Sequence, residues 1–495
     1  MNQQNSTSVR WQAANALRLV SIIVSTVALS CGIQGQSRAD EAMAGFDNKT
    51  NGYEAQGDFD SDKGKFEEVE NIETNGLGPV YNGTSCVGCH QNPVTGSASQ
   101  ISVLRAGHFD HKKHKFVEPP GGSLIFQRAI DAAIQAHVPP GNEIRTLRMA
   151  TNVLGNGYVE CIADEDILKV QQGQPLRVRG AIVLLPALVG LERVEEVPKP
   201  GGQPGEKKKK FVFKSTERIG RFGWKCQDAS LLNFSAGAYF NEMGVTSPVH
   251  DTENSSNGRD VSQYDKVEDP EDKPEADPAN PGKYKNPFGG DVMAFTRFMR
   301  STKAPPEDSS VAPAGTLAHG RKLFKSIGCA VCHVSEWTTV AAGAKIADFT
   351  VPDAMGGRTL HPYSDFMLHD VASGDGIVQT QHAQKPVNYE RWSMKLSPIK
   401  DGPHVYRSAK DLYHYEDIEE KHRYMGTRFV NTASMIRTAP LWGLRTRPQL
   451  MHDGLSLTVT EAIERHGNQG KYARAGYRGL NKGEKSDLLA FLSSL

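Results

Sequence analysis

The chain has 495 residues, with 57 basic and 57 acidic side chains, so no overall charge points to nucleic acid as a partner. That length suits two or three domains, each able to bury a core without disulfide bonds. Beyond the N-terminal region no segment is long and apolar enough to span a membrane, so we expect no transmembrane segment in the mature chain.

Residues 1–39 have the pattern of a secretory signal peptide. They contain arginines but no acidic residue, and residues 19–30 form an apolar run too short to cross a bilayer comfortably. Ser37-Arg38-Ala39 supplies a small-x-small cleavage pattern. We therefore expect cleavage near Ala39 and a periplasmic mature protein. A buried N-terminal helix and a lipoprotein site at Cys31 are the weaker alternatives.

Two copies of one cysteine motif predict the cofactor. The sequence Cys-x-x-Cys-His, typical of c-type haem attachment, occurs at residues 86–90 and 329–333. Two thiols at this spacing reach two vinyl groups on one edge of a porphyrin, and the following imidazole binds the iron. We therefore expect two covalently attached haem c groups. Their expected thioether links are Cys86, Cys89, Cys329 and Cys332, and their expected iron ligands are His90 and His333.

Other uses of these cysteines explain the pattern less well. A zinc site built from both pairs leaves the two following histidines without a role, and a redox dithiol needs no histidine. Export also suits haem, because c-type attachment happens outside the cytoplasm. Cys161 and Cys226 remain, and in an oxidising compartment they form either a disulfide or two buried free thiols.

The pattern along the chain predicts a mainly α protein with two cytochrome c-like haem domains, long loops and little β structure. We expect an N-terminal haem domain over residues 40–310, with polar insertions near 196–210 and 251–290. A C-terminal cytochrome c domain follows over residues 311–495. Strand signal is sparse apart from residues 178–190.

Two apolar stripes predict the helices of the C-terminal domain. Leu323, Phe324 and Ile327 share one helix face just before the second motif, and a second stripe lies on a helix at the end of the chain. We expect these helices to cross beside the porphyrin. The second stripe consists of Leu488, Phe491, Leu492 and Leu495.

A further helix carries the candidate second ligand of the C-terminal haem. Thr458 and Glu461 form a capping box at its start, and His466 lies on the same face as Val459 and Ile463. We expect His466 to bind the iron opposite His333, the alternative being a core histidine bonded to a carbonyl group.

Four segments resemble the bacterial di-haem cytochrome c peroxidase superfamily, and most closely its di-haem oxidoreductase branch. The resemblance runs from about residue 75 to the end of the chain. His466 stands where the peroxidases typically carry methionine, and imidazole lowers the haem potential relative to a thioether. The segments are RIGRFGWKCQ (218–227), FSAGAYFNEMGVTSP (234–248), HPYSDFMLHD (361–370) and MIRTAPLWGLRTRPQLMHDGLSLTVTEAIERHG (435–467).

This resemblance implies two catalytic residues. Trp224 matches the tryptophan between the two haems, where it would bridge electron transfer, with core packing as the alternative. Glu242 matches the glutamate over the open N-terminal haem, where it would act as an acid–base group, with a surface carboxylate as the alternative. The assisting glutamine of the peroxidases has no clear counterpart. Cys161 and Cys226 stand where the branch tends to have alanine, which favours a disulfide.

Several further positions stay open at this stage. The other face of the N-terminal haem is closed by His108, His111 or His114, or it is open. Methionines offer further ligands or core residues, and two arginines are candidates for the haem propionates. Part of the peroxidases' calcium site is also recognisable, so Ca²⁺ is a possible cofactor. These residues are Met149, Met243, Met425 and Met451, then Arg437 and Arg221, then Thr446 and Pro448.

The resemblance favours a peroxidase-like enzyme. A small redox protein would donate electrons to the C-terminal haem, Trp224 would pass them on, and hydrogen peroxide would be reduced at the N-terminal haem with Glu242. Two alternatives stand beside it: a non-catalytic di-haem electron carrier, and an oxygenase-type enzyme that uses O2 on an organic substrate. No residue supports thiol oxidation, because haem attachment takes four of the mature cysteines.

Overall fold

A computed structural model describes residues 40–112, 115–199, 203–267, 273–378 and 432–495, and the backbone of residues 389–393 and 420–424. The expected signal peptide, His114 and Met425 lie outside the described residues. The chain divides into two compact units, Met1–Asp40 and Glu41–Leu495, and every element named below belongs to the second. In the part of the chain that is described, no helix could span a membrane.

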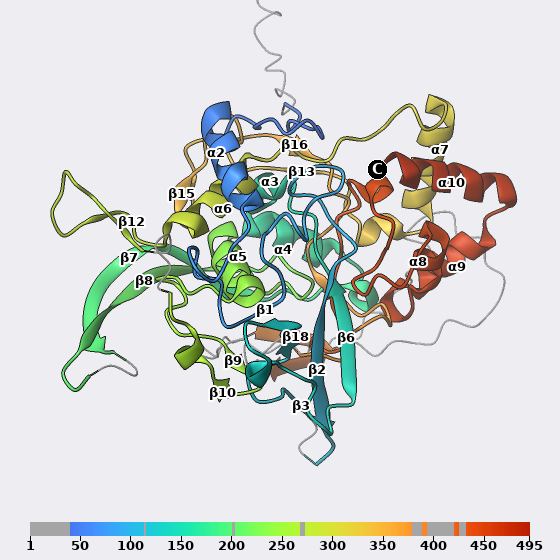
Figure 1. Ribbon diagram of the computed structural model, residues 1–495. Coiled ribbons are helices and arrows are strands. Elements are labelled where there is room, and N and C mark those ends of the chain that lie inside the picture. Colours follow the sequence, from blue (N-terminus) through green and yellow to red (C-terminus); the bar gives the residue numbers. More distant parts are fainter. Residues whose placement is uncertain are drawn as a thin grey trace, which may run out of the picture. The chain divides into compact units, whose positions relative to one another are not determined.

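The predicted mainly α class is wrong. Among the described residues helices account for 28% and strands for 22%. The longest strands, β7 (Leu184–Pro198) and β8 (Lys207–Ile219), form the antiparallel hairpin that projects from its neighbours in Figure 1. They take in both ends of the expected polar insertion near 196–210, residues 196–198 and 207–210. Opposite charges face each other across this pair, with Glu195 opposite Lys210 and Glu196 opposite Lys209, which stabilises strands in a segment of loop-like composition.

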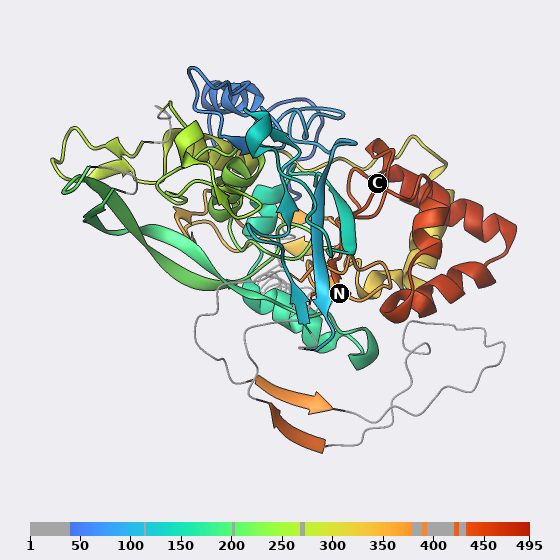
Figure 2. The ribbon, with the colours of Figure 1, turned by 60° about the horizontal axis from the view of Figure 1, so that its bottom comes forward.

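A second sheet has β2 (Ser102–Asp110) at its centre. It pairs with β3 (Lys115–Val117), β4 (Leu124–Ile125) and β6 (Ile144–Met149), and Figure 2 shows β2 and β6 side by side. Its buried face packs Ala106 and Leu124 against neighbouring apolar side chains. Strand β6 ends at Met149, which lines the functional site described below.

The remaining strands are short, and their pairs are scattered along the chain, which leaves the segment 251–290 mostly irregular. They are β1 (Val80–Tyr81), β5 (Arg128–Ala129), β9 (Ser255–Ser256), β10 (Arg259–Asp260), β11 (Glu275–Ala276), β12 (Tyr284–Asn286), β13 (Trp337–Thr338), β14 (Lys345–Ile346), β15 (Phe349–Thr350), β16 (Thr359–Leu360), β17 (Leu368–His369), β18 (Tyr389–Ser393), β19 (Glu420–Tyr424) and β20 (Ile436–Arg437).

Three helices support the first cysteine motif. α2 (Gln56–Glu67) and α5 (Leu231–Ala238) pack against α6 (Gly290–Ser301), and their aromatic side chains share one core. The motif follows β1 as a turn against the end of α2, where the Val87 amide donates to the Phe66 carbonyl at 3.2 Å. A wider π-helical turn, η3 (Tyr239–Met243), continues α5. Two further helices are α3 (Asn156–Glu160) and α4 (Asp164–Gly173).

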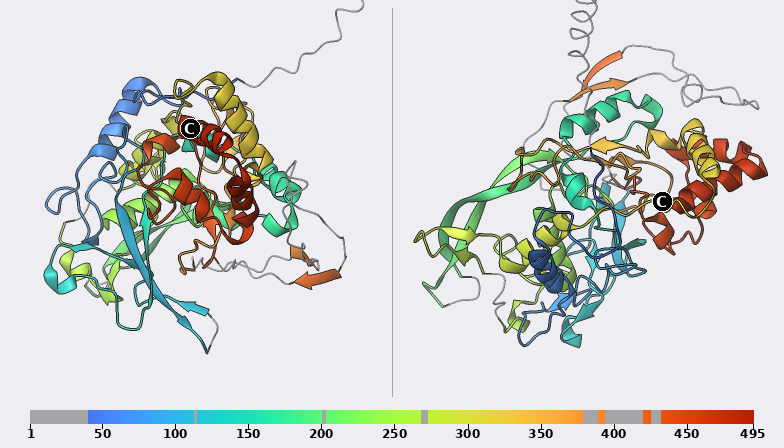
Figure 3. Two further views of the ribbon diagram at one scale, coloured as in Figure 1. Left: turned by 90° about the vertical axis from the view of Figure 1, so that its right-hand side faces the viewer. Right: turned by 90° about the horizontal axis from the view of Figure 1, so that it is seen from above.

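The C-terminal helices follow the predicted stripes. α7 (Ala314–Ser326) and α10 (Lys482–Ser494) cross side by side and share a core that includes Phe324, Leu488 and Phe491, as expected (Figure 3). Gly320 lets them approach closely, because a Cβ there would lie 2.1 Å from the Asp487 carbonyl oxygen. The other C-terminal helices are α8 (Val459–Glu464) and α9 (Lys471–Gly479).

Single helical turns connect these elements. They are η1 (Ala132–Ile134), η2 (Leu176–Val178), η4 (Ser262–Tyr264), η5 (Cys329–Val331), η6 (Leu444–Thr446) and η7 (Asn468–Gly470).

Candidate functional site

The second motif lines a pocket between α7, α8 and the loops before them. Cys329, Cys332 and His333 lie on one side, and His466, just after α8, lies in the same pocket. The predicted capping box is present: the Thr458 hydroxyl accepts from the Glu461 amide, and the Glu461 carboxylate accepts from the Thr458 amide, both at 3.1 Å. The local helix start therefore sets the position of His466.

His333 and His466 face each other across this pocket. Each ring uses Nδ1 on a backbone carbonyl, His333 donating to Tyr363 at 2.9 Å and His466 to Ala462 at 2.7 Å. Each Nε2 is thus left as the candidate metal ligand. The ring centres are 6.4 Å apart. Two imidazoles bound to one metal at about 2 Å per bond, with ring centres about 1 Å behind the nitrogens, have centres about 6 Å apart. The pair fits one iron between them.

Two arginines also line the pocket, Arg437, which is buried, and Arg447, which is half-buried. Arg437 donates to the Gly223 carbonyl at 2.6 Å and Arg447 to the Pro440 carbonyl at 2.6 Å, while Nε of Arg447 has no hydrogen-bond partner within the described part of the chain. Burial, with the charge of Arg437 nearby, lowers the pKa of Arg447 to about 10. Two neighbouring cations in the pocket wall, one buried and one half-buried, suit a ligand with anionic groups, such as the haem propionates.

Sequence reasoning named Arg437 and Arg221 for the propionates and missed Arg447. Arg221 is instead fully buried against Asp164, with which it forms an ion pair, and donates to the Ile162 carbonyl at 2.7 Å. It therefore stabilises the fold near α4. The signal in the sequence that could have identified Arg447 is the repeat of arginine at positions 445 and 447.

Trp224 lies in the wall of the pocket that holds the second motif. It is 9% exposed, its Nε1 donates to the Met149 carbonyl at 2.8 Å, and its ring meets His452 edge-on with 6.1 Å between centres. The residues after the first motif form part of the same wall: Ala98, Ser99 and Gln100 line the pocket. Residues that follow the first motif therefore share one pocket with the second motif.

The first motif holds a half-buried, neutral histidine. The His90 ring donates through Nδ1 to the Ser97 carbonyl at 3.2 Å and lies 6.0 Å from the ring of Phe66. Burial lowers the pKa of His90 to about 4, so the ring is neutral with one nitrogen free of a proton, and the Thr151 backbone is a second polar neighbour of the ring. Burial also raises the pKa of the Cys89 thiol to about 11.

The histidines of the β2–β3 hairpin are held elsewhere. His108 contacts the Asn142 side chain at 3.3 Å, and the exposed His111 packs on Phe109 with 5.2 Å between ring centres. A strand rises about 3.3 Å per residue, so His108 lies about 20 Å along β2 from its start at Ser102. The described interactions therefore do not bring His108 or His111 to His90.

Glu242 adjoins the first motif from the turn η3. Asn82 donates to its Oε2 at 3.0 Å, and the Asn82 and Gly83 amides donate to its backbone carbonyl at 2.7 and 3.0 Å. Burial raises the pKa of Glu242, which the nearby Arg105 partly offsets. Its charge is also felt at Cys89, whose pKa it raises further. Glu242 is thus a half-buried carboxyl group beside the motif.

Other positions named from sequence have structural partners. Cys161 and Cys226 are buried free thiols in this structure, and Cys226 donates to the Phe366 carbonyl at 3.2 Å, so the expected disulfide is not formed. The Thr446 hydroxyl donates to the Gly443 carbonyl at 2.7 Å. Met243 is buried in the core around α5, whereas Met149 and Met451 line the pocket that holds the second motif. Trp224 likewise packs as a buried side chain while lining that pocket.

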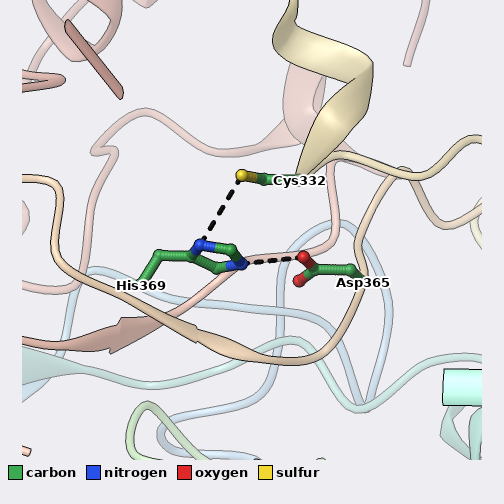
Figure 4. A group of neighbouring side chains, drawn as sticks. All are labelled: Cys332, Asp365 and His369. Atoms are coloured by element: carbon green, nitrogen blue, oxygen red, sulfur yellow. Dashed lines mark hydrogen bonds and ion pairs between the residues drawn. The ribbon is translucent and has the colours of Figure 1, made fainter. Parts of the chain in front are cut away.

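Among the described residues, Cys332, Asp365 and His369 have ligand atoms within 4.8 Å of one another. Figure 4 shows the imidazole between the other two, with Nδ1 3.6 Å from the Cys332 sulfur and Nε2 2.8 Å from Asp365. The thiol and the carboxylate therefore meet different ring nitrogens, an arrangement that suits a hydrogen-bonded chain better than chelation of one ion. The sequence analysis quoted residues 361–370, which contain Asp365 and His369, but gave these two residues no role.

Comparisons with known proteins place the chain in a family. The sequence model of the family described as "Di-haem oxidoreductase, putative peroxidase" matches residues 211–395 and 410–495. This match includes the second motif but begins well after residue 75, so the first motif lies outside it. Comparison with curated proteins found no match.

Among solved structures, a Kuenenia stuttgartiensis hydrazine synthase pressurised with xenon is similar at 16% identity and a TM-score of 0.21. The alignment covers 44% of this chain and 60% of that one, and such a TM-score does not establish a shared fold. The family match, in contrast, covers more than half of the chain. The protein therefore belongs to the di-haem oxidoreductase family, whose cofactors are haems.

Proposed function

We propose that this protein is an exported c-type di-haem oxidoreductase that reduces hydrogen peroxide with electrons from a small redox protein. Cys86, Cys89 and His90 would hold one haem. Bound haem supplies a redox-active iron for electron transfer and, where an axial position is open, for reaction with a small oxidant. The other haem would be held by Cys329, Cys332, His333 and His466.

The contrast between the two histidine environments carries this proposal. Facing His333 is a second imidazole, with 6.4 Å between the ring centres, so His333 and His466 would both hold an iron bound here. Facing His90, the described residues offer no such imidazole; Glu242 stands near Cys89 instead. A haem that only transfers electrons can be held by two histidines. A haem that reacts with peroxide needs one side of the iron free of a protein ligand.

Glu242 would move the proton that peroxide reduction requires. As a carboxylate it would accept a proton from one peroxide oxygen and return it to the other, which then leaves as water. Two electrons and two protons in total convert one peroxide into two waters. Asn82 holds Oε2 of Glu242 at 3.0 Å, and burial brings the carboxyl pKa nearer to neutrality, where a proton shuttle works best.

Trp224 would serve as the bridge between the haems. Its indole is fixed by the hydrogen bond to the Met149 carbonyl. Trp224 lies in the wall of the pocket that holds the second motif, to which residues after the first motif also contribute. Electrons would reach the second haem from a small soluble donor protein. Residues 1–39 support export, and hence a periplasmic donor.

Spectroscopy of the mature protein tests this proposal. We expect one high-spin and one low-spin ferric haem by EPR, and peroxide-dependent oxidation of a reduced small cytochrome. The His466→Gly variant should convert the low-spin haem to high spin and leave the other unchanged. Two low-spin haems would instead indicate a non-catalytic carrier. O2 uptake with an organic substrate and no peroxide turnover would indicate an oxygenase.

A further inference from the structure

We propose that Tyr239 is a redox-active tyrosine of the first haem site, able to supply one electron for peroxide reduction when the donor protein is absent. This inference rests on the proposed peroxide chemistry. It arises from a buried group of side chains beside Cys86 that the proposed reaction does not use. Tyr239 is the first residue of the turn η3, which also carries Glu242.

The phenol lies between two carboxyl groups. Its hydroxyl is 3.4 Å from Oε1 of Glu70 and 3.4 Å from Oδ2 of Asp291, and its ring packs edge-on against Phe295 with 5.1 Å between centres. Tyr239 is 1% exposed, Glu70 2% and Asp291 3%, so water is excluded from the group. A buried tyrosine hydroxyl needs one partner, and here two acidic ones converge on it.

This arrangement provides what tyrosine oxidation requires. Removal of an electron makes the phenol strongly acidic, so the electron leaves readily only if a base can take the proton. Lys65 lies 3.8 Å from Oδ1 of Asp291, so a positive charge stands beside one of the two carboxyl groups that can accept the proton. Glu70 offers a second acceptor on the other side of the hydroxyl.

The group is held against the first motif. The Glu70 amide donates to the Thr84 carbonyl at 2.7 Å, two residues before Cys86. After burial itself, the charge of Glu70 is the largest influence that raises the pKa of the Cys86 thiol, and Asp291 also contributes. The turn η3 thus borders both cysteines, with Glu242 near Cys89 and the partners of Tyr239 near Cys86.

The step balances with hydrogen peroxide as oxidant. Tyr239 would give up one of the two electrons that hydrogen peroxide takes, its O–H bond would break, and the proton would pass to Glu70 or Asp291, which leaves a neutral tyrosyl radical. The reduced second haem supplies the other electron that peroxide needs. An electron from the donor protein, with return of the proton, later restores the phenol.

Rapid-freeze EPR of the full di-haem protein tests this inference. The haem of the second motif is first reduced by one electron and the reductant is removed. After mixing with hydrogen peroxide without donor, we expect a tyrosyl radical signal that narrows when ring-deuterated tyrosine is incorporated. Tyr239→Phe should reduce that signal at least tenfold. The matched control is Tyr158→Phe, since Tyr158 is fully buried but its hydroxyl accepts from the Met43 amide at 3.2 Å; this variant should keep the signal.

The proton acceptors give a second measurement. Asp291→Asn and Glu70→Gln should keep both haem spectra but lower the radical yield, and the double variant should lower it most. An undiminished radical in Tyr239→Phe overturns the inference, as does an optical reaction with peroxide that yields no tyrosyl signal. If peroxide leaves the haem spectrum unchanged, the proposed function itself fails and takes the inference with it.

Discussion

The two cysteine motifs are alike in sequence but lie in different surroundings. The second follows a regular helix, α7, and shares its pocket with an opposing histidine and with Arg437 and Arg447. The first lies in a turn between β1 and the end of α2, bordered by the π-helical turn η3 and by the acidic residues Glu242, Glu70 and Asp291. Cationic side chains and paired imidazoles stabilise a bound haem, whereas acidic groups beside an open position handle protons. We therefore propose that the same cysteine motif serves two different tasks.

Removal of either cysteine pair is expected to have the largest effect. Cys86→Ser with Cys89→Ser should abolish covalent attachment of one haem, and Cys329→Ser with Cys332→Ser should abolish the other, because each pair makes its own thioether links. Intact mass and haem staining measure this. Cys161→Ser with Cys226→Ser is the control and should keep both haems, since these thiols lie outside the motifs. Retention of two covalent haems in either motif variant would refute the attachment model.

Glu242→Gln should lower peroxide turnover by about 100-fold or more, the usual effect of losing a positioned acid–base group. The second haem should keep its spectrum. Burial raises the pKa of Glu242, so in the wild type the carboxylate fraction, and with it kcat/KM for peroxide, should rise with pH above the ordinary glutamate range. The variant should lose this rise.

Glu253→Gln is the matched control for that variant, because burial also raises the pKa of Glu253, to about 8. It should leave both turnover and the pH profile unchanged. An equal loss of turnover in Glu242→Gln and Glu253→Gln would show that neutralising either carboxyl group disturbs the enzyme. Glu242 would then have no special role.

Trp224→Phe should slow electron transfer from the second haem to the first by about tenfold, equivalent to about 1.4 kcal/mol of barrier. Stopped-flow reduction by a small donor should show the second haem reduced at the normal rate and the first reduced late. Trp337→Phe is the control, since Trp337 is also buried and donates to a carbonyl, that of Ser364, at 2.8 Å. Similar rates in the two variants would contradict a bridge at Trp224.

Arg447→Gln should have the smallest effect, a more negative potential of the second haem. The guanidinium stabilises the reduced iron, which carries one positive charge less, by about 1–2 kcal/mol at an effective dielectric constant of about 20. Spectroelectrochemical titration measures it. The exposed Arg478, paired with Glu464, is the control site, and Arg478→Gln should leave the potential unchanged. A shift of the first haem alone would place Arg447 at the wrong site.

Local signals in the sequence predicted local features of the structure. The stripes of α7 and α10 and the capping box at Thr458 are present, because each depends on residues three or four positions apart in one helix. The mainly α class failed at the hairpin β7–β8, whose stability depends on cross-strand pairs between residues with a loop between them. The assignment of Arg221 failed because its partner Asp164 lies 57 positions away.

The sequence alone determined the two attachment motifs, the helix that carries His466 and the family resemblance, since these are patterns of neighbouring residues. Only the tertiary structure decided which distant side chains meet. It set His466 opposite His333, Arg447 beside Arg437, and Tyr239 between Glu70 and Asp291. The physical reason is that burial and electrostatic environment depend on contacts between segments far apart in the chain, and no local pattern records those contacts.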